Sequence, residues 1–131
     1  MRELARRTNM AHPLVLIIDA DETARDLYGH WFSAHGFQVM CAVGTVGLSL
    51  ALRRERPQLI VTELRARDLT LAALTARLQS DATTRCIPIL VLTSASDRTV
   101  IDSAKAAGVA VVLPKWCDFD LLDSWVSALC S

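Results

Sequence analysis

The sequence predicts an α/β fold with a five-stranded parallel sheet in the flavodoxin-like order 2-1-3-4-5 and helices on both faces. First, five short apolar runs rich in branched residues alternate with longer segments that have a helical period. Second, these runs have no polar face, which is typical of strands buried on both sides between crossover helices. Right-handed crossovers between five such strands then favour the stated order.

The expected strands are too short for helices and are rich in β-branched residues. Each is followed by a segment long enough for a helix, so the expected element order is βαβαβαβαβα. The strands are expected over Leu14 to Ile18, Phe37 to Val43, Leu59 to Thr62, Pro88 to Leu92 and Val109 to Leu113.

Two of the expected helices carry a clear apolar stripe. Gly36 is placed to end the first of them in a left-handed turn, and Asp118 and Asp120 lie near the positive amino end of the last. The other helices are expected over Thr45 to Glu55, Leu69 to Gln79 and Arg98 to Ala107. The first stripe consists of Ala24, Leu27, Tyr28, Trp31 and His35, and the last of Leu121, Leu122, Trp125, Val126 and Leu129.

The length of 131 residues fits one domain, and we expect a flexible leader over residues 1–12 followed by a domain over residues 13–131. With 14 basic and 14 acidic residues, the net charge favours neither nucleic acid nor a membrane surface as a partner. No apolar run approaches the roughly 20 residues of a membrane span, and the leader lacks the apolar core of a secretory signal. We therefore expect a cytoplasmic protein with reduced cysteines.

Polar residues follow four of the strands, in the segments "DADE", "TELRARD", "TSASD" and "PKWC". In an open parallel sheet the functional crevice lies at the carboxyl ends of the strands. The sequence therefore predicts a site that gathers Asp19, Asp21, Glu63, Thr93 and Lys115. Carboxylates held close together require a cation among them, either a hard metal such as magnesium or a basic side chain.

The segments "VLIIDADE", "RPQLIVTEL", "IPILVLTS" and "VVLPK" resemble the receiver domain of two-component response regulators, from about Pro13 onward. In that family an aspartate after the third strand accepts phosphate, and an acidic pair after the first strand binds magnesium. A hydroxyl residue after the fourth strand and a lysine after the fifth contact the phosphoryl group. The resemblance thus makes Glu63 the phosphoacceptor equivalent, and Thr93 and Lys115 the equivalents of the phosphate contacts.

The sequence departs from the receiver pattern at several of these positions. Glu63 stands where the family has aspartate, Ala20 stands where it has the second acid, and Asp21 comes one step late. The segment after Glu63 has no proline or glycine, and Val112 stands where an aromatic switch residue is expected. A carboxylate longer by one methylene is misplaced by about 1 Å, which can reduce a rate about a hundredfold. We therefore expect an atypical, pseudo-receiver variant that has no enzymatic activity and is not phosphorylated.

The cation of the site has several candidates. Lys115 could pair with Glu63, or Arg65 and Arg67 could fold back over the acids in place of magnesium. Solvated arginines on a loop are the plainer alternative for those two. We expect no cofactor, with magnesium weak or absent and held by Asp19 and Glu63 if it binds at all.

Other interpretations remain open from the sequence. Asp21 could cap the first helix instead of forming an acidic pocket with Asp19 and Glu63. Thr93 could serve merely to close a turn. The main alternative function is an active receiver that accepts a phosphoryl group in a magnesium-dependent reaction. A nucleotide- or flavin-binding enzyme is less favoured, because "VGTVG" at Val43 to Gly47 lacks the glycine pattern of phosphate loops.

The resemblance also implies a partner surface on the fourth helix, the fifth strand and the fifth helix. We expect the partner to be a histidine kinase, a phosphatase or an effector of a phosphorelay, or a second copy of this chain, with no direct contact to nucleic acid or membrane. Trp116 could anchor that interface or pack over the loop beside Lys115, whereas Trp125 is expected in the core. The surface residues are Arg98, Asp102, Lys105, Val112 and Trp116.

Overall fold

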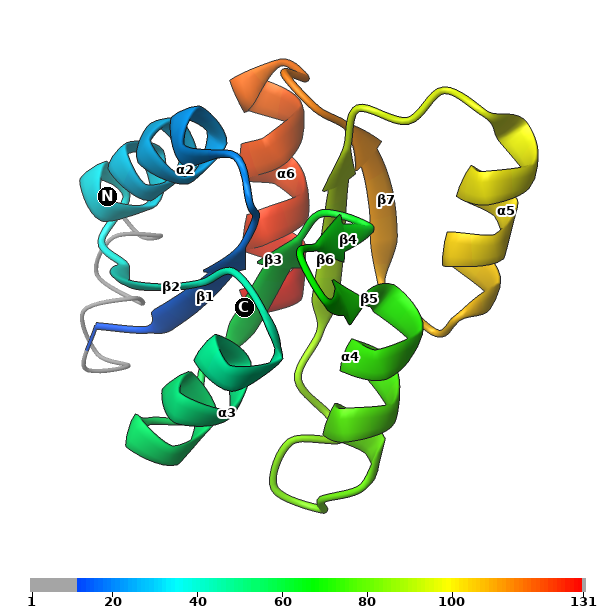
Figure 1. Ribbon diagram of the computed structural model, residues 1–131. Coiled ribbons are helices and arrows are strands. Elements are labelled where there is room, and N and C mark those ends of the chain that lie inside the picture. Colours follow the sequence, from blue (N-terminus) through cyan, green and yellow to red (C-terminus); the bar gives the residue numbers. More distant parts are fainter. Residues whose placement is uncertain (1–11, 131) are drawn as a thin grey trace.

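The computed structural model describes residues 12–130, and its main sheet is parallel throughout (Figure 1). The strand order is β2-β1-β3-β6-β7, which confirms the flavodoxin-like order expected from the sequence. The strands are β1 (Leu14–Ile18), β2 (Gln38–Ala42), β3 (Leu59–Thr62), β6 (Ile89–Thr93) and β7 (Val111–Pro114). Apart from His12, the expected leader lies outside the described residues.

Helices cover both faces of this sheet. Alternate side chains of β1 point to opposite faces, so that Val15 packs with α2 and α6 whereas Leu16 packs with α3, α4 and α5. The central strands β1, β3 and β6 are therefore buried on both sides, as their apolar composition predicts, whereas the edge strands β2 and β7 are only partly buried. The helices are α2 (Glu22–Ala34), α3 (Thr45–Arg54), α4 (Leu71–Gln79), α5 (Arg98–Ala106) and α6 (Phe119–Cys130).

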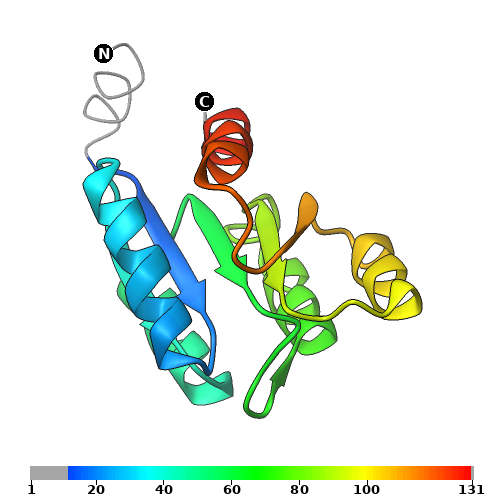
Figure 2. The same ribbon diagram turned by 90° about the horizontal axis from the view of Figure 1, so that it is seen from above.

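A short antiparallel hairpin after β3 was not expected from the sequence. It consists of β4 (Arg65–Ala66) and β5 (Leu69–Thr70), and it projects beyond the carboxyl ends of the main strands (Figure 2). Ala66 and Leu69 face each other and are buried, while Arg67 turns the chain with a positive φ of 58°. Helix α4 therefore begins at Leu71 rather than at Leu69, with Thr70 as its amino cap.

The two apolar stripes are placed somewhat differently from the prediction. In α2 the buried residues are Ala24, Tyr28 and Phe32, whereas Leu27 is exposed. In α6 the buried residues are Leu122, Val126 and Cys130, four residues apart, so that Leu121 and Trp125 lie on the flanks of the stripe and are exposed. The expectation that Trp125 belongs to the core was therefore wrong. The other helices and strands begin and end within two residues of their expected positions. Within residues 12–130, no helix is long and apolar enough to cross a membrane.

Candidate functional site

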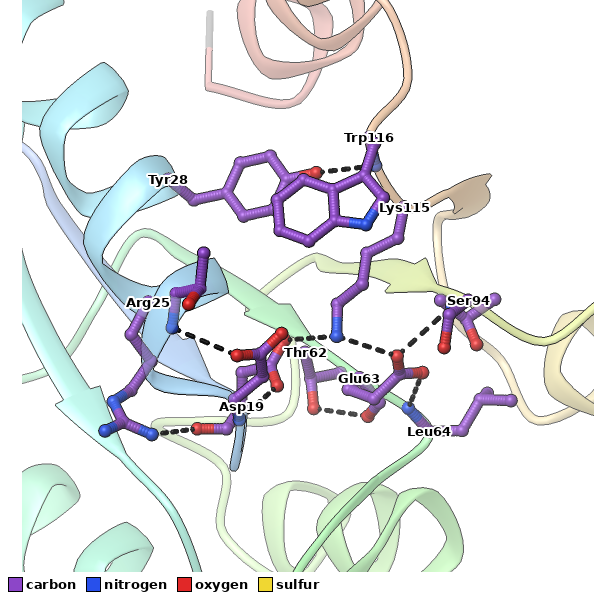
Figure 3. A network of polar contacts seen from close by, with 12 residues as sticks. Asp19, Arg25, Tyr28, Thr62, Glu63, Leu64, Ser94, Lys115 and Trp116 are labelled. Carbon is purple, nitrogen blue, oxygen red and sulfur yellow. Dashed lines mark hydrogen bonds and ion pairs between the residues drawn. The ribbon is translucent and has the colours of Figure 1, made fainter.

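Four strands deliver polar side chains to one edge of the sheet (Figure 3). Asp19 follows β1, Glu63 follows β3, Thr93 ends β6 and Lys115 follows β7. These strands are neighbours and all are parallel, so their carboxyl ends lie at the same edge. The structure thus brings together these four side chains of the sequence-predicted site.

Lys115 lies at the centre of this group, between the two carboxylates. Its Nζ atom is 2.9 Å from Oδ2 of Asp19 and 3.1 Å from Oε2 of Glu63. The side chains of Lys115, Asp19 and Glu63 are only 7%, 8% and 14% exposed. The cation that the acidic cluster requires is therefore the ammonium group of Lys115.

Both carboxylate oxygens of Glu63 accept hydrogen bonds. The main-chain N–H of Leu64 donates to Oε1 at 2.8 Å, and the main-chain N–H of Ser94 donates to Oε2 at 3.2 Å. Burial raises the pKa of Glu63, but hydrogen bonds from the Thr93 hydroxyl, the Leu64 N–H and Lys115 outweigh it and hold this pKa below its usual value. Glu63 is therefore an ionised carboxylate at neutral pH.

The pKa of Lys115 is raised, whereas that of Glu63 is lowered. Burial lowers this pKa, but the hydrogen bonds and charges of Asp19 and Glu63 raise it above the usual lysine value. The lysine is therefore positively charged and lies between two acidic side chains.

Asp19 and Asp21 have separate roles. Oδ1 of Asp19 accepts the main-chain N–H of Asp21 at 2.9 Å, which orients the carboxylate toward Lys115. Asp21 caps α2 by accepting the N–H of Thr23 at 3.0 Å, and its side chain is exposed. Of the two interpretations of Asp21, the helix cap is the one that the structure supports.

Arg25 is a residue of the site that the sequence reasoning missed. Its Nη1 donates to the main-chain oxygen of Asp19 at 2.8 Å (Figure 3). Its position six residues after Asp19, one turn into the first helix, would have placed it beside the strand end. Arg25 fixes the turn that carries Asp19.

Solved structures of receiver domains have a similar fold. The receiver domain of a signal transduction histidine kinase from Syntrophus aciditrophicus is 24% identical, with 90% of this chain and 89% of that chain covered and a TM-score of 0.80. This chain has the receiver-domain fold. Neither a protein-family model nor a curated protein matches the sequence.

Two further receiver structures are similar over almost their whole length. The chemotaxis response regulator CheY4 of Vibrio cholerae is 19% identical over 90% of this chain and 98% of its own, with a TM-score of 0.79. The receiver domain of a sensor histidine kinase from Pseudomonas aeruginosa, solved with magnesium in its active-site cleft, is 16% identical over 91% and 98%, with a TM-score of 0.81. These identities are low, so the likeness concerns the fold.

The donor set at this edge of the receiver fold does not suit magnesium. Asp19 and Glu63 are both paired with an ammonium group, Ala20 offers no ligand, and Asp21 caps a helix. Magnesium prefers an octahedral set of oxygen ligands, and a lysine between two carboxylates occupies that position with a positive charge. In the part of the chain that the structure describes, no three His, Cys, Asp or Glu side chains lie close enough to hold a metal ion.

The arginine candidates do not supply the cation. Arg65 and Arg67 lie on the hairpin of β4 and β5 and are exposed, and neither is paired with Asp19 or Glu63. The hypothesis that they fold back over the acids was therefore wrong. The hairpin, which takes the place of a proline- and glycine-containing turn, directs both side chains to solvent.

Thr93 is almost fully buried beside Glu63. Its Oγ1 accepts the main-chain N–H of Ala95 at 3.0 Å, which closes the turn after β6. The same hydroxyl contributes to the low pKa of Glu63. Thr93 thus both shapes the turn and touches the acidic pocket.

Trp116 lies over Tyr28 of α2. Its main-chain N–H donates to the Tyr28 hydroxyl at 3.0 Å, and the two rings stack with centroids 5.9 Å apart. Trp116 has a positive φ of 62° and remains 52% exposed. Trp116 is thus packed on α2 beside Lys115 and is half exposed, and its role as the anchor of an interface stays a prediction.

The expected partner surface is divided between the two faces of the receiver fold. Trp116 lies with Tyr28 on the side of α2 and α6, whereas Arg98 and Asp102 form an exposed ion pair of 3.8 Å on α5. Val112 is half-buried against the side chains beneath α3, α4 and α5. Whether these residues act as one partner surface stays a prediction, since β7 is the edge strand between the two faces.

Proposed function

We propose that this domain is a receiver-like signalling module that is not phosphorylated and that acts through protein contacts without enzymatic activity. One observation carries the proposal. Lys115 bridges Asp19 and Glu63 within 3.1 Å, so the phosphoacceptor equivalent is already neutralised by a cation of the chain itself. A receiver whose site holds a fixed ion pair has no need of a transferred phosphoryl group to order that site.

The hydrogen bonds of Glu63 support this proposal. By resemblance to receivers, Lys115 and the turn after β6 are the groups that contact a phosphoryl group. In this chain the Glu63 Oε2 atom accepts from Lys115 and from the Ser94 N–H. Glu63 thus satisfies these donors with about one negative charge, where a phosphorylated side chain would carry about −1.5 to −2.

Phosphoryl transfer to Glu63 is disfavoured for two reasons. The nucleophile must lie in line with the donor, and metal ions and a basic side chain must neutralise the charge that spreads over the equatorial oxygens. The Glu63 oxygens are held by Leu64, Ser94 and Lys115, and Ala20 lacks the carboxylate that would complete a magnesium site. The chain therefore meets neither requirement well: the nucleophile is held by other contacts, and the magnesium site is incomplete.

The contacts of such a module would be with other proteins of a two-component system, such as a histidine kinase, a phosphatase or an effector. Trp116 is a suitable anchor for such a contact, because tryptophan is enriched among the residues that dominate interface energies. It is half exposed, and its main chain is fixed by Tyr28 beside Lys115. A partner bound there would sense the arrangement of the acidic pocket.

The experiment is incubation with acetyl phosphate and magnesium, followed by intact mass measurement. We expect no phosphoryl adduct on the natural chain. The matched variant combines Glu63→Asp with Ala20→Asp, which restores a shorter acceptor and a second acid, and we expect it to gain a phosphoryl group. A stable adduct on the natural chain that Glu63→Gln abolishes would overturn the proposal.

A further inference from the structure

Strand β2 forms an open edge of the main sheet. It pairs with β1 on one side, and no strand of residues 12–130 pairs with it on the other. Its sequence, Gln38–Ala42, contains no charge and no proline, which are the features that usually protect an exposed edge. Among residues 12–130, its outer N–H and C=O groups therefore have no strand partner and can pair with another extended strand.

The surface beside this edge is apolar on the side of α3. Figure 1 shows β2 at the margin of the sheet, between α2 and α3. A groove between β2 and α3 is lined by Met40, Cys41 and Leu50. On α3 itself, Val46 is 72% exposed and Leu50 is 55% exposed. Apolar side chains of this size gain free energy when a partner covers them.

The two ends of α3 carry opposite charges. Arg54, in the last turn, lines the groove beside β2 and is exposed. Asp68 lies at the other end, where it accepts the main-chain N–H of Thr45 at 3.0 Å. If a second copy is turned end for end, its Asp68 faces Arg54 of the first copy, and its Arg54 faces Asp68. The charges of this face are therefore complementary to themselves under a two-fold rotation.

We propose that two copies of this chain associate through antiparallel pairing of their β2 edges, with the two α3 helices packed side by side in opposite directions. The occupant of the groove is thus a second copy. The pairing joins the two sheets into one, buries Val46 and Leu50, and places Arg54 of each copy beside Asp68 of the other. The association does not depend on the state of Glu63, which lies at the strand ends and away from the edge.

The first test is the molar mass of the complete chain by sedimentation equilibrium over a range of concentrations. We expect a dimer for the natural chain and a dissociation constant raised at least about tenfold by Leu50→Glu, since this change places a charge in an apolar contact. Val100→Glu, an equally drastic change at an exposed position on α5, is the matched control and should leave the dimer intact. A monomer at every concentration, or a dimer broken by Val100→Glu but not by Leu50→Glu, overturns the proposal.

The second test uses Cys41, which is exposed on the same edge. Directly opposed residues of an antiparallel pair have Cα atoms about 4.5 to 5.5 Å apart, so two Cys41 thiols near the two-fold axis are within reach of a short bis-maleimide. We expect a covalent dimer that Cys41→Ser abolishes and that Cys86→Ser, at another exposed cysteine, leaves unchanged. Crosslinking through Cys86 instead would contradict the proposed pairing.

The third test concerns the direction of pairing. Arg54→Asp should weaken the dimer, and addition of Asp68→Arg should restore it, because the charges are then exchanged across the interface. Because Asp68→Arg also removes the acceptor of the Thr45 N–H, the baseline is Arg54→Asp combined with Asp68→Ala. A charge-exchanged double variant that dimerises no better than this baseline rules out the antiparallel arrangement.

Discussion

The main-chain N–H of Trp116 donates a hydrogen bond of 3.0 Å to the hydroxyl of Tyr28, which lies 88 residues earlier in the chain. The chain is thereby fastened to α2 at the residue directly after Lys115. Since Trp116 adopts a left-handed φ of 62°, this bond also helps to hold a backbone conformation that non-glycine residues seldom adopt. The position of the Lys115 backbone thus depends on a side chain of α2.

Tyr28→Phe should therefore destabilise the protein without changing its packing volume. Loss of the hydroxyl leaves the half-buried N–H of Trp116 without its partner, which costs about 1 kcal/mol of unfolding free energy. Urea unfolding followed by circular dichroism measures the difference. Phe119→Leu, which removes an edge contact to the same ring but no hydrogen bond, is the comparison. Equal stability of Tyr28→Phe and the natural chain would contradict the proposed role of the bond.

Lys115→Met should be strongly destabilising. The change leaves two nearly buried carboxylates close together without a cation, and removal of one partner from a buried ion pair costs about 3 to 5 kcal/mol. Addition of Glu63→Gln should recover part of this loss, because one of the two unpaired charges is then absent. Urea unfolding of both variants provides the measurement. Lys105→Met, at an exposed position of α5, should change stability by less than about 0.5 kcal/mol.

Acid should weaken the fold partly through Glu63. The pKa of Glu63 lies below its usual value of 4.5 in the folded protein, so the folded chain binds fewer protons than the unfolded chain in this range. The stabilisation by Glu63 is therefore complete above the usual pKa of 4.5, which applies to the unfolded chain. It is lost as the pH falls through the lower pKa that Glu63 has in the folded protein. We expect the urea midpoint to fall between pH about 6 and about 3, and less steeply in Glu63→Gln.

The comparison for this prediction is Glu55→Gln, since Glu55 is exposed at the end of α3. That variant should keep the acid dependence of the natural chain. A Glu63→Gln variant with an unchanged dependence would show that other carboxylates account for the loss of stability in acid.

The hairpin after β3 is tied to the start of α3 by a hydrogen bond of Asp68, in addition to the shared core. Asp68 accepts the N–H of Thr45, and a Cβ added at Gly44 would lie 2.7 Å from the Asp68 Oδ1 atom. Gly44→Ala should therefore displace the Asp68 carboxylate and release the Thr45 amide, as Asp68→Ala does directly. We expect faster hydrogen exchange at Thr45 in each variant and no further increase in the double variant. Additive effects would mean that Gly44 and Asp68 act on α3 independently.

The sequence sufficed for the parallel sheet and for the meeting of Glu63 with Lys115, because the ends of neighbouring parallel strands share an edge whatever the loops do. It did not suffice for the hairpin, since two-residue strands have too few positions to show a period of two. The stacking of Trp116 on Tyr28 could not be predicted from the sequence either. It depends on a left-handed φ at Trp116 and on a tyrosine that lies 88 residues away in the chain. The hairpin and the position of Trp116 depend on local backbone conformation and on contacts between distant residues. Neither produces a periodic pattern in the sequence.

Magnesium should not bind the acidic pocket at millimolar concentration. Lys115 carries a positive charge between the two carboxylates that would be its ligands, and magnesium would have to displace this charge while lacking a third acid at Ala20. Trp116, next to Lys115, is a suitable reporter, because its stacking on Tyr28 should change if Lys115 moves. We therefore expect no saturable change in tryptophan fluorescence during a magnesium titration of the natural chain. In Ala20→Asp combined with Lys115→Met, which adds a ligand and removes the competing ammonium group, we expect a saturable change that Trp116→Phe abolishes. A saturable change in the natural chain that Asp19→Asn removes would establish a metal site despite the ion pairs.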